Sequence, residues 1–228
     1  MKISIPGKNK KCSKDRWRGE GSKGAATRKM IIAAGRRVFR SHPYQAASFR
    51  MIAQEGGFSF TLINHYFTKA ELFESVVEEV MEELLAASKT WMEGLDAMPA
   101  EKGLSLFLDR VLAYLFNKPD PVLLLMQNVA EGDKDGEIPG FDRFSAYVSE
   151  AKDMIIRVAP GEYDSEQAVW WVYSMINLMI VYIGASSYHA KVLGVAPRSP
   201  EYRNWIKQSL MYLFLPRLER SVKSKKLQ

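Results

Sequence analysis

The sequence contains very little that could cross-link the chain or hold a metal ion. Its 228 residues include one cysteine, Cys12, which excludes both a disulfide bond within the chain and a cysteine-based metal cluster. The three histidines, His42, His65 and His189, are too scattered to match a metal-ligand spacing. We therefore expect no metal and no other cofactor, and the shortage of cysteine fits a reducing cytoplasm.

Sequence signatures of the common catalytic sites are also missing. The chain has no G-x-S-x-G elbow, no H-E-x-x-H motif, no phosphate-binding loop and no Rossmann glycine fingerprint. The paired carboxylates Glu78-Glu79 and Glu82-Glu83 fall on a helix face that we expect to be solvated. The sequence therefore gives no support for an enzyme.

Neither a secretory signal nor a strand pattern is present. The N-terminus, MKISIPGKNKK, lacks the apolar stretch of an exported protein, which favours a cytoplasmic location. No segment alternates apolar and polar residues, whereas helical spacing recurs and hydrophobic residues make up 47% of the chain. The predicted fold is all-α with about nine helices, three in an N-terminal head and six in a larger body. These helices are predicted at residues 25–41, 49–55, 60–66, 69–94, 104–117, 121–131, 141–158, 165–193 and 201–223.

Positive charge is concentrated toward the N-terminus. Residues 1–68 contain 14 Lys/Arg and 3 Asp/Glu, a net charge of +11, whereas residues 69–228 contain 18 and 23, a net charge of −5. This asymmetry indicates that the N-terminal part meets a polyanion. Residues 1–24 are basic and show no period, so we expect a mostly disordered arm. The arm is either a plain flexible terminus or a segment that adds phosphate or minor-groove contacts to DNA.

Residues 25–70 have the pattern of a helix-turn-helix DNA-binding domain. Two short amphipathic segments meet at Gly56-Gly57, which supply the backbone freedom for a turn. Each segment follows a serine, Ser48 or Ser59, of the kind that caps a helix N-terminus. The next helix begins at a capping box, T-K-A-E at residues 68–71.

The same stretch resembles the N-terminal domain of the TetR family of bacterial repressors. The resemblance covers residues 25–80 and rests on a set of residues in a fixed order. They are Ile31, Ala34, Phe39, Tyr44, Ser48, Arg50, Ile52, Ala53, Gly57, Ser59, Ile63, His65, Tyr66, Phe67 and Lys69. It implies a homodimeric transcriptional regulator, most simply a repressor, that binds a near-palindromic site on double-stranded DNA. Residues 71–228 would then bind an unknown small-molecule effector and form the dimer.

Nine residues are candidate DNA contacts. Ser48 and Ser59 present helix N-termini, where backbone N–H groups favour phosphate. Arg50 is suited to phosphate or guanine, Asn64 to adenine, and Phe60 to a thymine methyl group. The full set is Ser48, Arg50, Ser59, Phe60, Thr61, Asn64, His65, Tyr66 and Lys69.

The resemblance places the last three of these residues at the DNA backbone, and the sequence departs from the family at three points nearby. Thr61 and Asn64 replace a small residue and a tyrosine, so one phosphate contact is exchanged for a candidate base contact. Pro43 replaces a glycine, which stiffens the turn. The link before Lys69 is one residue shorter than usual, so we expect Lys69 to point differently from its family counterpart.

Residues 168–190 contain no charged residue and are long enough to suggest a membrane span. Polar residues inside the segment, such as Asn177 and His189, argue against a span. In the TetR family the last two helices form the dimer interface, and a helix buried on both sides needs little polarity. We favour that interpretation and expect no membrane partner.

Aromatic residues and methionines are frequent in the body, as in apolar ligand pockets that contain a few polar groups. They predict a small apolar or amphipathic ligand. The candidate contacts are Trp91, Tyr114, Met126, Asn128, Tyr147, Trp171, Met175 and Asn177.

Residues 131–142 imitate a calcium-binding EF-hand loop, with acidic residues at positions 1, 3, 5 and 12 and glycine at position 6. Glu131 at position 1, the short Asp142 at position 12 and Pro139 favour an acidic surface turn instead.

Two other functions stay open. One is a regulator without any ligand, and the other is a non-regulatory helical module that binds a small molecule or associates with a membrane.

Overall fold

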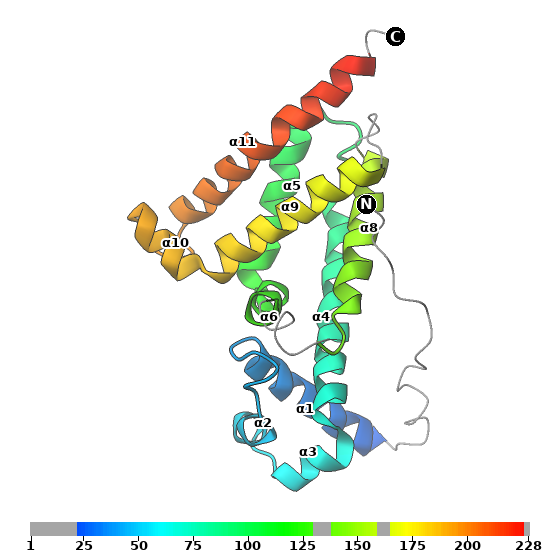
Figure 1. Ribbon diagram of the computed structural model, residues 1–228, viewed down its shortest axis with the longest axis vertical. Helices are drawn as coiled ribbons and strands as arrows, with labels where there is room; N and C mark the ends of the chain where they lie inside the picture. Colours follow the sequence, from blue (N-terminus) through cyan, green and yellow to red (C-terminus); the bar gives the residue numbers. More distant parts are fainter. Residues whose placement is uncertain (1–21, 130–137, 159–164, 226–228) are drawn as a thin grey trace. The chain divides into compact units, whose positions relative to one another are not determined.

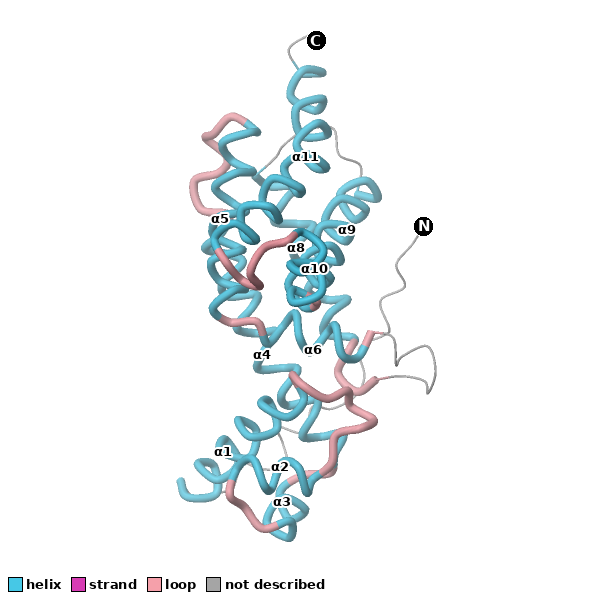
Figure 2. Tube along the Cα trace, turned by 90° about the vertical axis from the view of Figure 1, so that its left-hand side faces the viewer, coloured by secondary structure: helices cyan, strands magenta, loops and turns pink. Residues whose placement is uncertain are grey.

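The computed structural model describes residues 22–129, 138–158 and 165–225. Within these ranges the chain forms ten helices and no strand, joined by short loops (Figures 1 and 2). The helices are α1 (Ser22–Phe39), α2 (Phe49–Gly56), α3 (Phe60–Tyr66), α4 (Lys69–Trp91), α5 (Ala100–Asn117), α6 (Asp120–Asn128), α8 (Asp142–Val158), α9 (Ser165–Gly184), α10 (Ser186–Leu193) and α11 (Pro200–Lys225). The all-α prediction is confirmed.

The prediction of one helix over residues 165–193 is wrong. The segment divides at Ala185, whose φ of −104° and ψ of 31° separate α9 from α10. Gly184 precedes the break and Ser186-Ser187 follow it. Glycine destabilises a helix interior, and serine competes for backbone hydrogen bonds, so this is where the helix ends. Helix α5 begins at Ala100, four residues before its predicted start, and Pro99 is its N-cap residue.

The chain divides into two compact units. The head unit consists of residues 22–82, 123–129 and 138–145 of the described chain, and the body unit of residues 83–122, 146–158 and 165–225. Helices α4, α6 and α8 each contribute residues to both units. The predicted division at residues 70 and 71 stays a prediction.

The core of the head is built from the apolar faces of its short helices. Ile31 on α1, Ile52 on α2, Ile63 on α3 and Leu72 on α4 are all fully buried. The rings of Phe39 and Phe73 add an edge-to-face pair with centroids 4.8 Å apart, although each aromatic pair of this kind contributes only about 1 kcal/mol beyond burial. This packing fixes which faces of α2 and α3 remain exposed.

The start of α4 has the predicted capping box. The Thr68 backbone N–H donates to the Glu71 carboxylate at 2.9 Å, and the Glu71 N–H donates to the Thr68 hydroxyl at 3.2 Å. Phe67 and Leu72, at the two staple positions, are buried. The capping therefore sets where α3 ends and α4 begins.

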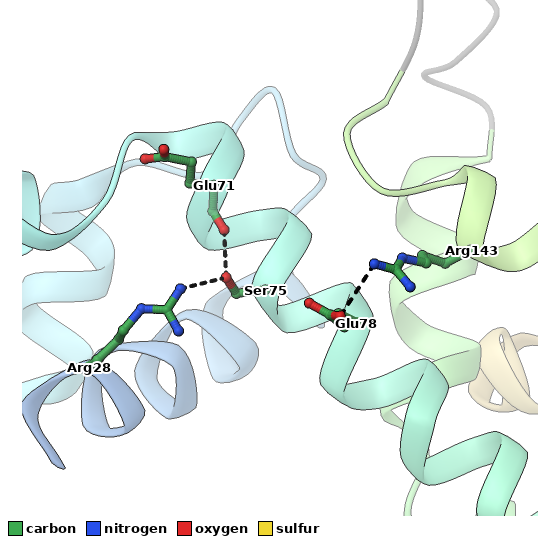
Figure 3. Close-up of polar contacts among 5 residues, drawn as sticks. All are labelled: Arg28, Glu71, Ser75, Glu78 and Arg143. Carbon is green, nitrogen blue, oxygen red and sulfur yellow. Dashed lines mark hydrogen bonds and ion pairs between the residues drawn. The ribbon is translucent and has the colours of Figure 1, made fainter. Parts of the chain in front are cut away.

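Two arginines of the head unit bind α4 (Figure 3). Arg28 on α1 donates to the Ser75 hydroxyl at 3.5 Å, and its guanidinium lies 4.7 Å from the centre of the Phe67 ring. Arg143, at the start of α8, pairs with Glu78 at 3.2 Å. Helices α1 and α8 are thus both fastened to α4 within this unit.

In the body unit, α11 packs on α5 and α9. Lys207 of α11 pairs with the Asp109 carboxylate of α5 at 2.7 Å, and Arg203 donates to the Asp109 carbonyl at 2.9 Å. The rings of Trp171 on α9 and Phe214 on α11 meet edge to face at 5.2 Å. These contacts define the framework of the body.

Candidate nucleic-acid interface

Two serines and two glycines shape the connection around α2 and α3. The Ser48 hydroxyl accepts from the Met51 N–H at 3.4 Å, and the Ser59 hydroxyl accepts from the Leu62 N–H at 3.1 Å. Gly57 has a φ of 71°, in the left-handed region that glycine adopts without strain. A Cβ on Gly56 would lie 2.1 Å from the Phe58 ring. Glycine is therefore needed at position 56 for lack of space and at position 57 for its backbone conformation. The predicted caps and turn are confirmed.

One face of α3 is exposed while the opposite face is buried. Phe60, Thr61, Asn64 and His65 are exposed, whereas Ile63 is completely buried. Residues 60, 61, 64 and 65 share a helix face because α-helical neighbours recur at three and four positions. The exposed face therefore presents an aromatic ring, a hydroxyl, an amide and an imidazole together.

Helix α2 adds a cation and a second aromatic ring. Arg50, in its first turn, is exposed. The Phe49 ring lies 6.2 Å from the Phe60 ring in an edge-to-face arrangement, which joins the N-terminal turns of α2 and α3. We call residues 48–50, 59–61, 64 and 65 the α2–α3 surface.

Tyr66 and Lys69 are not counted in the α2–α3 surface, because both side chains contact other residues of the head. Tyr66 is half-buried, with its ring 5.3 Å from that of His65. The Lys69 ammonium donates to the Gln45 carbonyl at 3.1 Å and lies 4.7 Å from the centre of the Tyr44 ring. Burial lowers the pKa of Lys69 below its ordinary value. Contact of either residue with phosphate stays a prediction.

The basic residues of the head differ in their surroundings. Arg37 on α1 pairs with Glu55 on α2 at 2.5 Å, with both side chains nearly half exposed. This pair fastens α2 to α1 and lowers the positive charge available there. Arg50, by contrast, is exposed in the first turn of α2.

The eight candidate ligand contacts do not form one group. Met126 and Asn128 belong to the head unit, and the other six belong to the body unit. Asn128 is fully buried, and its amide binds the backbone of Tyr44 and Leu124. Its side chain thus has a structural role that the sequence did not reveal, because Tyr44 lies 84 positions away.

Three of the six body residues lie together. The rings of Trp91 on α4 and Tyr114 on α5 meet edge to face at 5.3 Å. The hydroxyl of buried Tyr147 on α8 is 2.9 Å from that of Ser88 on α4. Burial raises the pKa of Tyr147 to about 12, and the nearby Tyr114 adds to the effect, although the Ser88 hydrogen bond opposes it. This α4–α5–α8 cluster contains aromatic surface and three hydroxyl groups, those of Ser88, Tyr114 and Tyr147.

The remaining three candidates lie on α9. Trp171 donates to the Phe214 carbonyl at 3.5 Å, and Met175 is buried. The Asn177 amide donates to the Tyr173 carbonyl of its own helix at 2.7 Å. Ligand contact by any of these residues stays a prediction.

Large apolar side chains remain exposed on the last helices. Trp170 and Tyr173 on α9 are 57% and 49% exposed, and Tyr212 and Leu213 on α11 are 82% and 51% exposed. Aromatic side chains of this kind are enriched at protein–protein interfaces. The uncharged segment at residues 168–190 was the sequence signal for Trp170 and Tyr173, whereas Tyr212 and Leu213 lie outside it.

By length and composition, α9 also qualifies as a membrane span. Residues Glu166–Gly184 have a mean hydropathy of 1.3, and 39% of the apolar window is buried. It is the one such helix in the part of the chain that the structure describes. A core helix of a soluble protein has the same composition, so this is weak evidence for a membrane.

The described residues bring no three His, Cys, Asp or Glu side chains into a group that could hold a metal ion. The candidate calcium loop at residues 131–142 falls largely outside the described residues.

Comparisons with known proteins agree with this geometry. Residues 31–76 match the profile of bacterial regulatory proteins of the tetR family. No curated protein sequence matches the chain.

Solved structures share the fold at low sequence identity. A TetR transcription regulator from Haloarcula marismortui is 20% identical with a TM-score of 0.58, over 83% of this chain and 97% of that one. The fatty acid degradation regulator FadR from Bacillus halodurans is 15% identical with a TM-score of 0.60, over 85% and 97%. FadR from Bacillus subtilis, solved with stearoyl-CoA, is 12% identical with a TM-score of 0.57, over 80% and 96%. Residues 31–76 thus match the tetR family of bacterial regulatory proteins, and the described chain has the same fold as these solved structures.

Proposed function

We propose that this protein is a DNA-binding transcriptional regulator of the TetR family, a cytoplasmic homodimeric repressor whose α2–α3 surface binds a near-palindromic operator. The observation that carries the proposal is the division of α3 into a buried face and an exposed polar face beside Arg50. Arginine and asparagine are the side chains best suited to bind guanine and adenine edges in the major groove. The capped N-terminus of α2 and the basic head favour the DNA backbone.

The proposed dimer brings together the exposed apolar side chains of α9 and α11. Trp170, Tyr173, Tyr212 and Leu213 supply the aromatic and aliphatic area that stable interfaces bury. A two-fold dimer presents two α3 helices to half-sites about 34–36 Å apart, or a multiple of that distance.

The proposed effector is a small apolar or amphipathic molecule bound by the body. The aromatic α4–α5–α8 cluster, with the hydroxyls of Ser88 and Tyr147, has the composition of such a site. B. subtilis FadR carries stearoyl-CoA, an amphipathic molecule, on a fold of this type. Effector and operator would then oppose each other reciprocally, because a ligand that favours one conformation disfavours the other.

The DNA-binding assignment is tested with two variants and two matched controls. A duplex is selected from a random pool by the full chain, alongside the region upstream of its own gene. We expect Arg50→Ala and Asn64→Ala each to weaken binding by about 1–3 kcal/mol in fluorescence anisotropy. Arg157→Ala and Asn204→Ala, exposed residues of the same types in the body, should bind as the wild type does. Equal affinity for all five proteins would reject the assignment.

The effector is tested by thermal shift. A library of fatty acids, acyl-CoA thioesters and aromatic compounds is added to the full chain, since a ligand that binds the folded state raises its Tm. A compound that raises Tm should also lower operator affinity. A library without any such compound would favour a regulator that works without a ligand.

A further inference from the structure

Asn128 is the most deeply buried polar side chain described in the head unit, and both of its polar atoms have a protein partner. Its Oδ1 accepts a hydrogen bond from the Tyr44 backbone N–H at 2.7 Å, and its Nδ2 donates to the Leu124 carbonyl at 2.9 Å. Burying an amide is costly unless it is hydrogen-bonded. The bond to Tyr44 therefore holds the C-terminal end of α6 to the turn between α1 and α2.

The backbone hydrogen bonds within the α1–α2 turn leave the Tyr44 N–H to be bound by Asn128. Ala46 and Ala47 both donate their backbone N–H groups to the Pro43 carbonyl, at 3.1 and 3.0 Å, which closes the turn on itself. Tyr44 points its N–H to Asn128 instead. A buried N–H without a partner costs about 1–3 kcal/mol, so the side chain of Asn128 completes the turn.

Helix α4 holds the other side of the same turn. Lys69 donates to the Gln45 carbonyl, and its ammonium lies 4.7 Å from the centre of the Tyr44 ring. The centre of the Tyr44 ring is in turn 4.9 Å from that of the Phe73 ring. The turn ends at Ser48, the N-cap of α2, two residues before Arg50. The position of the turn therefore sets the position of the first turn of α2.

We propose that Asn128 is a positioning residue for DNA binding. Its amide fixes the α1–α2 turn and thereby places the α2 N-terminus and Arg50 on the DNA-facing surface. The bond is short and directional, so a displacement of α6 by about 1 Å breaks it. Such a displacement lowers operator affinity without changing any residue that contacts DNA. The inference rests on the proposed function.

The test compares three variants of the full chain. Asn128→Leu keeps the volume and removes both hydrogen bonds. Asn128→Asp keeps an oxygen that accepts from the Tyr44 N–H, and it is also measured at mildly acidic pH, because burial favours the neutral carboxyl over the ionised carboxylate. Leu125→Ala, a buried residue of the same helix, is the control for lost stability. Operator affinity is measured below the Tm of every variant, and hydrogen exchange of the Tyr44 amide is followed by NMR.

We expect Asn128→Leu to speed exchange of the Tyr44 amide and to weaken operator binding, each by about tenfold or more. Asn128→Asp should keep the Tyr44 amide protected and bind the operator within about threefold of the wild type. If Asn128 contributed only to stability, retaining the acceptor oxygen would not be required to restore operator affinity. If Asn128→Leu does not fold, Asn128→Asp carries the test, and its loss of affinity with the Tyr44 amide still protected overturns the inference.

Two results with folded Asn128→Leu would also overturn the inference. One is wild-type operator affinity. The other is an equal loss of affinity in Leu125→Ala with its Tyr44 amide protected, because the loss would then follow stability rather than the bond. A wild-type chain that binds no duplex is a different failure, since it refutes the proposed function itself.

Discussion

Phe60 is 49% exposed at the start of α3, although burying such a ring elsewhere would stabilise the fold. The Phe49 ring beside it limits the directions in which it can turn. We expect Phe60 to contact a thymine methyl group. Replacing that thymine by deoxyuridine should then weaken binding of the wild type by about 0.8 kcal/mol, the value of one buried methylene. The same replacement should have no effect on Phe60→Ala.

The matched control for this thermodynamic cycle is Met30→Ala. Met30, on α1, is another large apolar residue of the head and is 57% exposed. It should retain the full dependence on the methyl group. If no thymine position shows a dependence that Phe60→Ala abolishes, Phe60 only covers the turn.

Tyr147 makes a prediction about stability at alkaline pH. Its pKa in the folded chain is raised from 10.0 to about 12, so the folded state holds the proton more tightly than the unfolded state. This contribution is complete below the unfolded pKa and is lost as the pH rises through the folded pKa. In Tyr147→Phe, denaturant unfolding should show a shallower fall of the free energy of unfolding between these two pH values. Tyr212→Phe, at an exposed site, should keep the wild-type slope.

At the scale of elements, the end of α2 makes a prediction with an internal control. Gly57 and Gly94 both have a left-handed backbone, with φ of 71° and 72°, and both have open space where a Cβ would stand. Alanine at either position should cost about 1–2 kcal/mol of stability because of the backbone alone.

The two alanine variants should differ in DNA binding. Gly57→Ala strains the connection between α2 and α3, so its operator affinity should fall. Gly94 follows α4 in the body unit, so Gly94→Ala should bind the operator as the wild type does. Equal operator affinity in two variants of equal Tm would mean that the geometry of this connection does not limit binding.

Local signals predicted most of these elements. The capping box at residues 68–71 and the two serine caps depend on contacts three residues apart, which a sequence displays directly. The exposed face of α3 followed from helical spacing around Ile63. The break at Ala185 was missed because apolar periodicity continues through it, and a single residue outside the helical region is enough to end a helix.

Contacts between distant residues could not be predicted in this way. Lys69 binds a carbonyl 24 positions away, and Asn128 binds an N–H group 84 positions away. In a sequence, a lysine that binds phosphate looks the same as one that binds a backbone carbonyl. Likewise, an asparagine that binds a ligand looks the same as one that binds a backbone N–H group. Only the packing of α4 and α6 against the α1–α2 turn shows that both side chains hold this turn.

For the whole molecule, the exposed apolar residues of α9 and α11 predict the oligomeric state. Trp170→Glu combined with Tyr212→Glu should convert a dimer into monomers in sedimentation velocity, because burial of two carboxylates in an apolar interface is strongly unfavourable. Tyr188→Glu, on α10 and 68% exposed, is the control and should remain dimeric. A double variant that sediments like the wild type would place the interface elsewhere.

Hydroxyl-radical footprinting of the full chain on its selected duplex tests the central claim most directly. The account predicts two symmetric protected patches centred about 34–36 Å apart, or a multiple of that distance, and their joint loss in Arg50→Ala at the same protein concentration. Absence of protection by folded wild-type protein at low salt, or one patch without a symmetric partner, would contradict it.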